Sequence, residues 1–290
     1  MNKRILILSL LIGVLGLGDA FAQMERRTVD QDRTIELVFP TPRHINIPST
    51  EPLSAGELYY SIMHTFGTID NGWRNLWGID SGANIRFSLE YGFTDRFSMH
   101  MGRSSMDRYY DLGLRYALLQ QTASGSMPIS IGFTLTGGIT SVDPDFLFQE
   151  FDFQDRLSFF TSLPISKRFG SNFSTLVVPM FSNFSKTDRF LNFENQEATQ
   201  YAGLGLGGRY KFSQAWAVTI QHITRYGIDQ GLNLDVLAFG VDWETGGHVF
   251  QMYFTNVQGI ADPNLLSAPA RNPFDGGFRF GFNINRSFQL

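Results

Sequence analysis

Apolar and polar residues alternate almost without interruption over the last fourteen residues of the chain. A β-strand points successive side chains to opposite faces, so a segment with this period has one apolar and one polar face. A chain that ends on such a strand is typical of bacterial outer-membrane barrels, in which the apolar face contacts lipid and the polar face lines a lumen. The apolar positions are Phe278, Phe280, Phe282, Ile284, Phe288 and Leu290.

The same period recurs in eleven further segments between residues 58 and 254. We assign their apolar positions to a lipid-facing set, which in the seventh segment comprises Leu176, Val178 and Met180. Compact links follow the even-numbered segments, and longer links follow most odd-numbered ones; the short link at residues 104–107 is the exception. The sequence therefore predicts an all-β fold: a transmembrane antiparallel β-barrel of about 12 strands over residues 55–290, with its short turns at one end.

A water-soluble β-sandwich is the alternative, because its strands also alternate and its turns are also polar. A sandwich, however, has no reason to place its tight turns at one end. Aromatic residues near the compact links, such as Tyr91, Phe212 and Trp216, fit an aromatic girdle at a membrane interface. These observations favour the barrel.

The N-terminal residues predict export. Lys3 and Arg4 precede an apolar stretch at residues 5–17, and Ala20 and Ala22 flank a cleavage site, so residues 1–22 form a predicted signal peptide. Residues 23–54 contain several charges followed by prolines, and we expect a flexible periplasmic segment there, with a plug in the lumen as the alternative. The expected location is the cell outer membrane, with this segment and the short turns in the periplasm.

Composition narrows the function classes. The chain has 28 Phe and 29 Gly in 290 residues, which suits strands with aromatic outer faces and small inner residues. Its mean hydropathy of −0.10 is compatible with a barrel, because lumen and lipid residues cancel along each strand. A formal net charge of −4 gives no electrostatic basis for nucleic-acid binding. The absence of cysteine excludes disulfides, thiolate metal sites and a cysteine-linked lipid anchor.

Several sequence blocks resemble a known family. Residues 76–86 read LWGIDSGANIR, and they are followed by Glu90-Tyr91-Gly92, Thr94-Asp95 and residues 102–105. Together these blocks resemble an uncharacterised Gram-negative family of outer-membrane β-barrels known as a domain of unknown function. The resemblance covers essentially all of the chain after the N-terminal segment. It implies a barrel in the outer membrane and assigns no activity and no functional residues.

The strand phases define the side chains that we expect to face the lumen, where transport chemistry would take place. Charges of both signs are present, so the set is compatible with a conducting lumen and equally with one that is filled by salt bridges. The lumen-lining candidates are Arg86, Glu90, His100, Arg115, Arg209, Lys211, Asp242, Glu244 and Arg279, together with Glu57, Asp111 and Arg225.

Other motifs carry less weight. Gly203, Gly205 and Gly208 spell GxGxxG, but they lie inside an alternating run, where inward glycines would relieve crowding. Five carboxylates at positions 143–155 do not match a calcium-loop spacing, and we expect a solvated loop instead. The five histidines form no hydrolase or metalloprotease motif. We therefore predict no catalytic, cofactor-binding or metal site and no enzyme activity.

The sequence leads to one functional hypothesis with two alternatives. We expect an outer-membrane β-barrel that acts as a passive or semi-selective channel for small solutes. The alternatives are a non-conducting structural or partner-binding barrel and, less favoured, an outer-membrane hydrolase. The expected partners are outer-membrane lipid and lipopolysaccharide, the barrel-assembly machinery through the C-terminal strand, and small solutes; no cofactor and no nucleic acid are expected.

Overall fold

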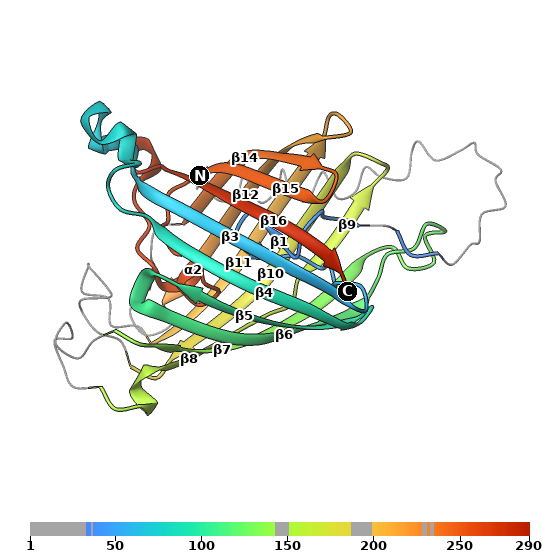
Figure 1. The fold of residues 1–290 in the computed structure, drawn as a ribbon, viewed down its shortest axis with the longest axis horizontal. Coiled ribbons are helices and arrows are strands. Elements are labelled where there is room, and N and C mark those ends of the chain that lie inside the picture. Colours follow the sequence, from blue (N-terminus) through green and yellow to red (C-terminus); the bar gives the residue numbers. More distant parts are fainter. Residues whose placement is uncertain (1–32, 36, 143–150, 187–198, 228–230, 233–234) are drawn as a thin grey trace.

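The chain forms a closed antiparallel β-barrel of twelve wall strands in the computed structural model, which describes residues 33–35, 37–142, 151–186, 199–227, 231–232 and 235–290 (Figure 1). Strands β8 and β9, which are separated by Leu163 and Pro164, together make up the sixth wall strand. The wall strands are β3 (Glu57–Thr68), β4 (Asn84–Thr94), β5 (Phe97–Ser104), β6 (Tyr109–Leu119), β7 (Ser130–Thr140), β8 (Leu157–Ser162), β9 (Ile165–Phe169), β10 (Phe173–Phe184), β11 (Gln200–Lys211), β12 (Trp216–Gly227), β14 (Val236–Thr245), β15 (His248–Thr255) and β16 (Arg279–Gln289).

The remaining elements are short. Among the described residues, no helix is long and apolar enough to cross a membrane. The short strands are β1 (Arg43–His44), β2 (Ile47–Pro48) and β13 (Gly231–Leu232). The short helices are α2 (Asn264–Ser267) and the 3-10 helices η1 (Ile69–Asn71), η2 (Trp73–Gly78), η3 (Met106–Arg108), η5 (Gln154–Arg156) and η6 (Pro273–Asp275).

The last strand closes the barrel against the first. Strand β16 pairs antiparallel with β3, with Ile284 opposite Ile62, and on its other edge with β15. Strand β11 pairs with both β10 and β12, which completes the ring. Closure leaves the wall without an unpaired edge strand, as a β-structure in lipid requires.

Alternation along the strands separates two environments. Outward-facing Met101 and Leu112 are each 56% exposed, whereas inward-facing Arg86 and Arg225 are 1% and 0% exposed. This arrangement confirms the predicted phase for eleven of the twelve segments. The apolar outer face matches a lipid environment, and the polar inner face keeps its groups within reach of hydrogen-bond partners.

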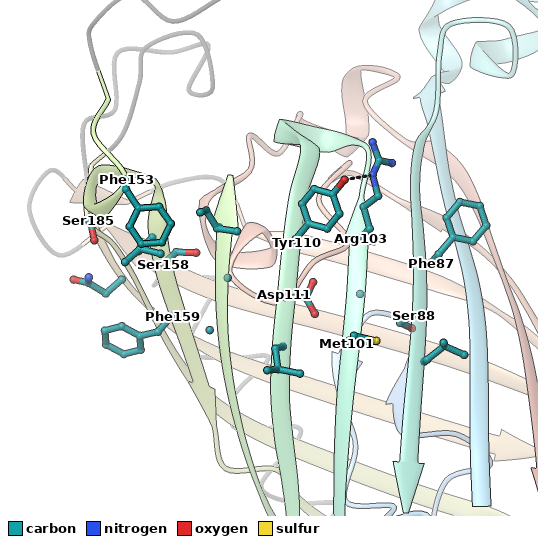
Figure 2. Close-up of a pocket in the computed structure, with 18 of the residues that line it drawn as sticks. Phe87, Ser88, Met101, Arg103, Tyr110, Asp111, Phe153, Ser158, Phe159 and Ser185 are labelled. Atoms are coloured by element: carbon teal, nitrogen blue, oxygen red, sulfur yellow. Dashed lines mark hydrogen bonds between the residues drawn. The ribbon is translucent and has the colours of Figure 1, made fainter. Parts of the chain in front are cut away.

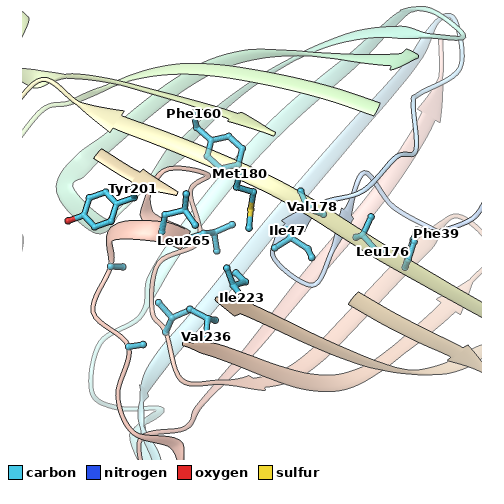
Figure 3. Packing of buried hydrophobic residues seen from close by; sticks show 14 of the residues in the cluster. Phe39, Ile47, Phe160, Leu176, Val178, Met180, Tyr201, Ile223, Val236 and Leu265 are labelled. Atoms are coloured by element: carbon cyan, nitrogen blue, oxygen red, sulfur yellow. The ribbon is translucent and has the colours of Figure 1, made fainter. Parts of the chain in front are cut away.

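The predicted phase of the seventh segment, now β10, is wrong. Leu176, Val178 and Met180 face the barrel interior and are almost completely buried, while Pro179 on the same strand is exposed. The error has a physical cause, because β10 is apolar on both faces and its periodicity therefore does not distinguish lumen from lipid. These inward side chains pack against an apolar cluster inside the barrel (Figure 3).

The two ends of the barrel differ as predicted. Compact links, for example between β4 and β5 and between β14 and β15, lie at one end, which we call the short-turn end. The links between β3 and β4 and between β15 and β16 are longer and lie at the opposite, long-loop end. The link between β5 and β6 is short, as its sequence indicated, and carries Asp107 and Arg108 with positive φ angles of 58° and 45°.

The chain before the first wall strand enters the barrel. Residues 38–53, which we call the lumen segment, are almost entirely buried, and β1 and β2 form a hairpin within it. For these residues the predicted flexible segment is wrong, and the alternative of a lumen plug describes them. Their apolar side chains, including Phe39 and Ile47, account for the difference, because the interior removes them from water. Residues 1–32, including the predicted signal peptide, lie outside the described residues.

A second insert enters from the opposite end. Residues 256–270, which we call the inward loop, connect β15 to the long link before β16 and are mostly buried. Helix α2 lies within this loop, and its Leu265 and Leu266 join Phe39 and Ile47 of the lumen segment in one apolar cluster (Figure 3). The interior of the barrel is therefore occupied by two chain segments that meet.

Candidate functional site in the barrel lumen

One group of predicted lumen residues forms ion pairs across strand β5. Arg86 on β4 binds Asp111 on β6 through both terminal nitrogens, with 2.8 Å between Nη2 and Oδ1. Arg115 on β6 places Nε 3.1 Å from Oε1 of Glu90 on β4. All four side chains are buried, so each charge has its counterion within the low-dielectric interior.

Glycines on β5 and β6 leave room for long side chains from the neighbouring strands. A Cβ at Gly102 would lie 2.4 Å from Nη2 of Arg86, and a Cβ at Gly113 would lie 2.4 Å from Cε1 of His100. His100 itself faces Thr136 on β7, with Nε2 3.2 Å from the Oγ1 atom. The small residues therefore give long side chains the room to lie flat against the inner wall.

A second ion-pair group lies across β12. Arg209 on β11 donates from Nε to Oδ2 of Asp242 on β14 at 2.8 Å, and it also pairs with Glu244. Lys211 places Nζ 3.2 Å from Oε2 of Glu244. Arg209 and Asp242 are buried, whereas Lys211 and Glu244 are partly exposed near the short-turn end.

The remaining predicted residues lie inside the barrel or at its ends. Arg225 is fully buried and donates to the carbonyl oxygens of Leu265, Leu266 and Ala268 at 3.1, 3.3 and 2.6 Å, which fixes the inward loop. Arg279 at the long-loop end donates to the carbonyl of Phe66 at 3.3 Å. Glu57 lies at the short-turn end, where its Oε2 accepts from the backbone of Ser54. A function for any of these residues in transport stays a prediction.

Wall side chains hold the hairpin of the lumen segment. Gln221 on β12 accepts from the backbone N–H groups of Asn46 and Ile47 at 3.1 and 3.3 Å. Asn283 on β16 donates from Nδ2 to the carbonyl of Ile45 at 2.9 Å. Because these two strands lie on different parts of the wall, the hairpin is fixed from more than one side.

The glycines of β11 accommodate both inserts. A Cβ at Gly205 would lie 3.3 Å from Cδ1 of Ile47, and a Cβ at Gly203 would lie 2.5 Å from Cδ2 of Leu266. The GxGxxG spacing is thus part of a strand, and its inward glycines relieve crowding as expected. Gly208 differs, because it faces outward and meets Ile220 instead.

The two inserts are joined by an ion pair that the sequence did not indicate. The guanidinium of Arg43 in the hairpin binds Oδ1 of Asp262 in the inward loop, and Nη1 of Arg43 donates to the carbonyl of Asn46 at 2.7 Å. Oδ2 of Asp262 also accepts from Thr136 on β7 at 3.1 Å. Both charged side chains are buried.

A sequence signal for this contact existed but was weak. Val38, Phe39, Ile45 and Ile47 give the presumed tail more apolar residues than a solvated segment needs, and this predicts burial. Nothing in the spacing of Arg43 and Asp262 indicates that they meet, because they are far apart in the chain and neither belongs to a periodic segment.

Burial of Glu51 makes the base of the lumen segment sensitive to pH. Its Oε1 accepts from the backbone N–H groups of Val38 and Phe39 at 2.9 and 3.1 Å, which ties the two ends of the segment together. Burial raises the pKa of Glu51 to about 7, although these hydrogen bonds oppose the shift. Since the native state binds the proton more tightly, its stability falls as pH rises from 4.5 to about 7.

We therefore expect the lumen segment to loosen as the pH rises from about 4.5 to neutrality. The rate of amide hydrogen exchange at residues 38–50 can be measured in detergent between about pH 5 and about pH 8, which spans the titration of Glu51. Over this range the rate should rise more steeply with pH than the intrinsic rate of an unprotected amide does. Glu51→Gln keeps the acceptor and removes the titration, so the excess should disappear. Glu57→Gln, which changes a carboxylate at the same end, is the matched control. An excess that persists in Glu51→Gln would contradict the assignment.

The described part of the chain offers no assembled metal centre. No cluster of three or more His, Asp or Glu side chains there could hold a metal ion. His222 lies 3.3 Å from Asp235 and His248 lies 3.2 Å from Arg286, both on the outer phase of the wall. Of the acidic loop, Asp143, Asp145 and Glu150 lie outside the described residues, so the expected solvated loop stays a prediction.

The wall is closed and antiparallel, its outer face is apolar, and its interior is charged. These features define a membrane-spanning β-barrel of the outer-membrane type. A family model described as "Membrane bound beta barrel domain (DUF5777)" matches residues 39–288. The chain belongs to this family of membrane-bound barrels, which confirms the resemblance seen in the sequence blocks.

Solved structures share the fold at low sequence identity. The NanC porin is 9% identical with a TM-score of 0.51, and the match covers 80% of this chain and 100% of NanC. The COG4313 outer membrane channel from Pseudomonas putida F1 is 16% identical with a TM-score of 0.50, and the match covers 82% of this chain and 98% of that protein. A search of curated protein sequences gave no match.

Proposed function

We propose that the protein is an outer-membrane channel for small solutes, passive or semi-selective, whose lumen is occupied by a displaceable segment. One observation carries the proposal. The wall closes completely through the β3 and β16 pairing, while β1 and β2 pair only with each other. The lumen segment therefore contributes no strand to the wall, and the ring of backbone hydrogen bonds does not depend on it.

The interior chemistry supports passage of polar solutes. Removal of the lumen segment would expose wall side chains such as Gln221, Asn283 and the Arg209 group to a common space. Two solved structures that share the fold are a porin and an outer membrane channel, and this likeness supports the proposal. Because most of the wall arginines are paired with carboxylates, we expect modest selectivity between cations and anions.

Orientation follows from the usual arrangement of bacterial barrels, in which short turns face the periplasm and long loops face the exterior. In this orientation the lumen segment enters from the periplasm. Residue 34 forms a β-bridge with residue 122 in the turn between β6 and β7, and the backbone N–H of Gly56 donates to the carbonyl of Gly92. Recognition of the C-terminal strand β16 by the assembly machinery, and contact with lipopolysaccharide, belong to the same proposal.

A non-conducting barrel is the second candidate, and the filled lumen favours it. The apolar cluster that unites Phe39, Ile47, Leu265 and Leu266 with the wall resembles a small protein core (Figure 3). Under this alternative the inserts are permanent, and the barrel serves as a scaffold or binds a partner. We propose no enzymatic activity, since Nε2 of buried His44 lies 2.9 Å from the carbonyl oxygen of Ile220, a backbone group that is neither a nucleophile nor a carboxylate.

Single-channel recording decides between the two candidates. Residues 23–290, refolded and inserted into planar bilayers, should give discrete conductance steps, with brief closures as the lumen segment returns. Arg209→Gln and Arg115→Gln should shift the reversal potential under a salt gradient toward cation preference, because each leaves a carboxylate without its counterion. Heat-modifiable migration in gels verifies folding. Folded, inserted protein that never conducts would reject the channel and leave the scaffold.

A further inference from the structure

The few charged residues on the outer face of the strands share one arrangement. Arg103, Lys167 and Arg286 are the charged Lys, Arg, Asp and Glu side chains that occupy the outward phase of the described strands, and all three are cations. Each lies over an aromatic ring: Arg103 over Tyr110 at 5.7 Å, Lys167 over Phe169 at 4.9 Å and Arg286 over Phe288 at 4.6 Å. Cations on the lipid face are tolerated near the membrane interfaces, where lipid phosphates lie.

Arg103 differs from the other two cations in its position. It lies one residue before the end of β5 at the long-loop end, whereas Lys167 and Arg286 lie near the short-turn end. Its Nε donates to the hydroxyl of Tyr110 at 3.3 Å. An arginine has five N–H donors, so the other donors of this exposed side chain are available to groups outside the barrel.

An apolar furrow runs past Arg103 and crosses the outer wall (Figure 2). It has a volume of about 1050 Å³ and runs between two rows of outward side chains that the strand register places side by side. The row nearer the long-loop end, which we call the upper row, consists of Phe87, Arg103, Tyr110, Ile139 and Leu157. The lower row consists of Leu89, Met101, Leu112, Gly137 and Phe159.

Glycines shape the furrow. Gly102 and Gly138 lie on its floor, between the two rows, and Gly137 interrupts the lower row. A Cβ at Gly137 would have no atom within 4 Å, so the missing side chain leaves open space there. The five strands from β4 to β8 are separated by four spacings of about 4.8 Å each, so the furrow extends for about 19 Å across the wall.

We propose that this furrow binds an acyl chain of a phosphorylated lipid, with Arg103 binding the phosphate. The lining is apolar over a length that suits an acyl chain, and the upper row carries the complementary cation. Tyr110 orients the guanidinium by one hydrogen bond and by its ring face, which presents the remaining donors at the rim. The site lies on the outer face of the barrel and does not depend on whether the lumen conducts.

Lipid retention measured by native mass spectrometry tests this site. The full-length mature protein, in a nonionic detergent, is titrated with phosphatidylglycerol or, separately, with a phosphate-free glucosyl diacylglycerol of the same chain length. Arg103→Gln should lower phosphatidylglycerol occupancy by about fivefold, the scale of one partly exposed charge-assisted contact, and leave binding of the phosphate-free glycolipid nearly unchanged. Gly137→Leu fills the furrow and should lower the occupancy of both lipids.

Arg286→Gln is the matched control, because it removes an outward cation stacked on an aromatic ring outside the furrow. It should leave retention of both lipids as in the unmodified protein. Heat-modifiable migration confirms that each variant is folded. The proposal is overturned if Arg286→Gln lowers phosphatidylglycerol binding as much as Arg103→Gln does, or if Gly137→Leu has no effect. The first result would indicate general surface charge and the second a headgroup contact without a furrow.

Discussion

Replacing residues 41–49 with a glycine-serine linker of equal length is expected to raise single-channel conductance severalfold. These residues are all buried and include the hairpin of β1 and β2, which fills the lumen between Gln221 and Asn283. The barrel should still form, because the replaced residues provide no wall strand. Planar-bilayer recording of the variant beside the unmodified protein measures the difference.

The control for this experiment is the same type of replacement in an exposed turn. Residues 213–215 link β11 to β12 at the short-turn end and are partly to fully exposed, so a glycine-serine linker there should leave conductance unchanged. A hairpin variant that is folded yet conducts no better than the unmodified protein would show that the hairpin does not limit the pore. The inward loop would then be the segment to replace.

Arg43→Ala is expected to destabilise the packed state of the lumen segment and the inward loop by about 3–5 kcal/mol, because it leaves the carboxylate of Asp262 buried without its closest counterion. Asp262→Ala should have an effect of similar size for the reciprocal reason. The double replacement Arg43→Met with Asp262→Leu removes both charges and should recover much of the loss. Hydrogen exchange at residues 38–50 and 256–270 reports the change.

An ion pair that joins the lumen segment to the inward loop should couple the stabilities of these two segments. If the ion pair joins them, Arg43→Ala must accelerate exchange in the inward loop as well as in the hairpin, and a double-mutant cycle must give a nonzero interaction energy. Arg86→Met with Asp111→Leu is a useful comparison, since it removes a buried ion pair that lies between wall strands. Independent effects of Arg43→Ala and Asp262→Ala would contradict the proposed connection.

Sequence reasoning succeeded where the lipid and lumen faces differ chemically. Alternation predicted the closing strand and placed Arg86, Glu90, Arg209 and Asp242 inside, because apolar side chains occupy the alternate positions of their strands. It failed at β10, where Leu176, Val177 and Val178 are apolar on both faces. There the inward side chains are apolar because they pack against the two inserts. The sequence of β10 alone does not show that these inserts are present.

The lumen contents were harder to predict for a related reason. The lumen segment reads as a tail because its strands β1 and β2 have only two residues each, too few for a period. Its position depends on long-range contacts such as His44 with Ile220 and Arg43 with Asp262. Such contacts follow from the shape of the closed barrel, which a local pattern does not contain. The apolar content of the segment was the available signal, and it was outweighed by the charges around it.

The seam between β3 and β16 also constrains how the molecule is assembled. It joins the first wall strand to the last, so the ring cannot close until nearly the whole chain has been synthesised. Contacts between such distant parts of a chain form slowly. The hairpin lies immediately before β3 in the chain, so an open seam would let it reach the lumen without threading a finished ring. A barrel that closed first would have to admit the hairpin through its short-turn end.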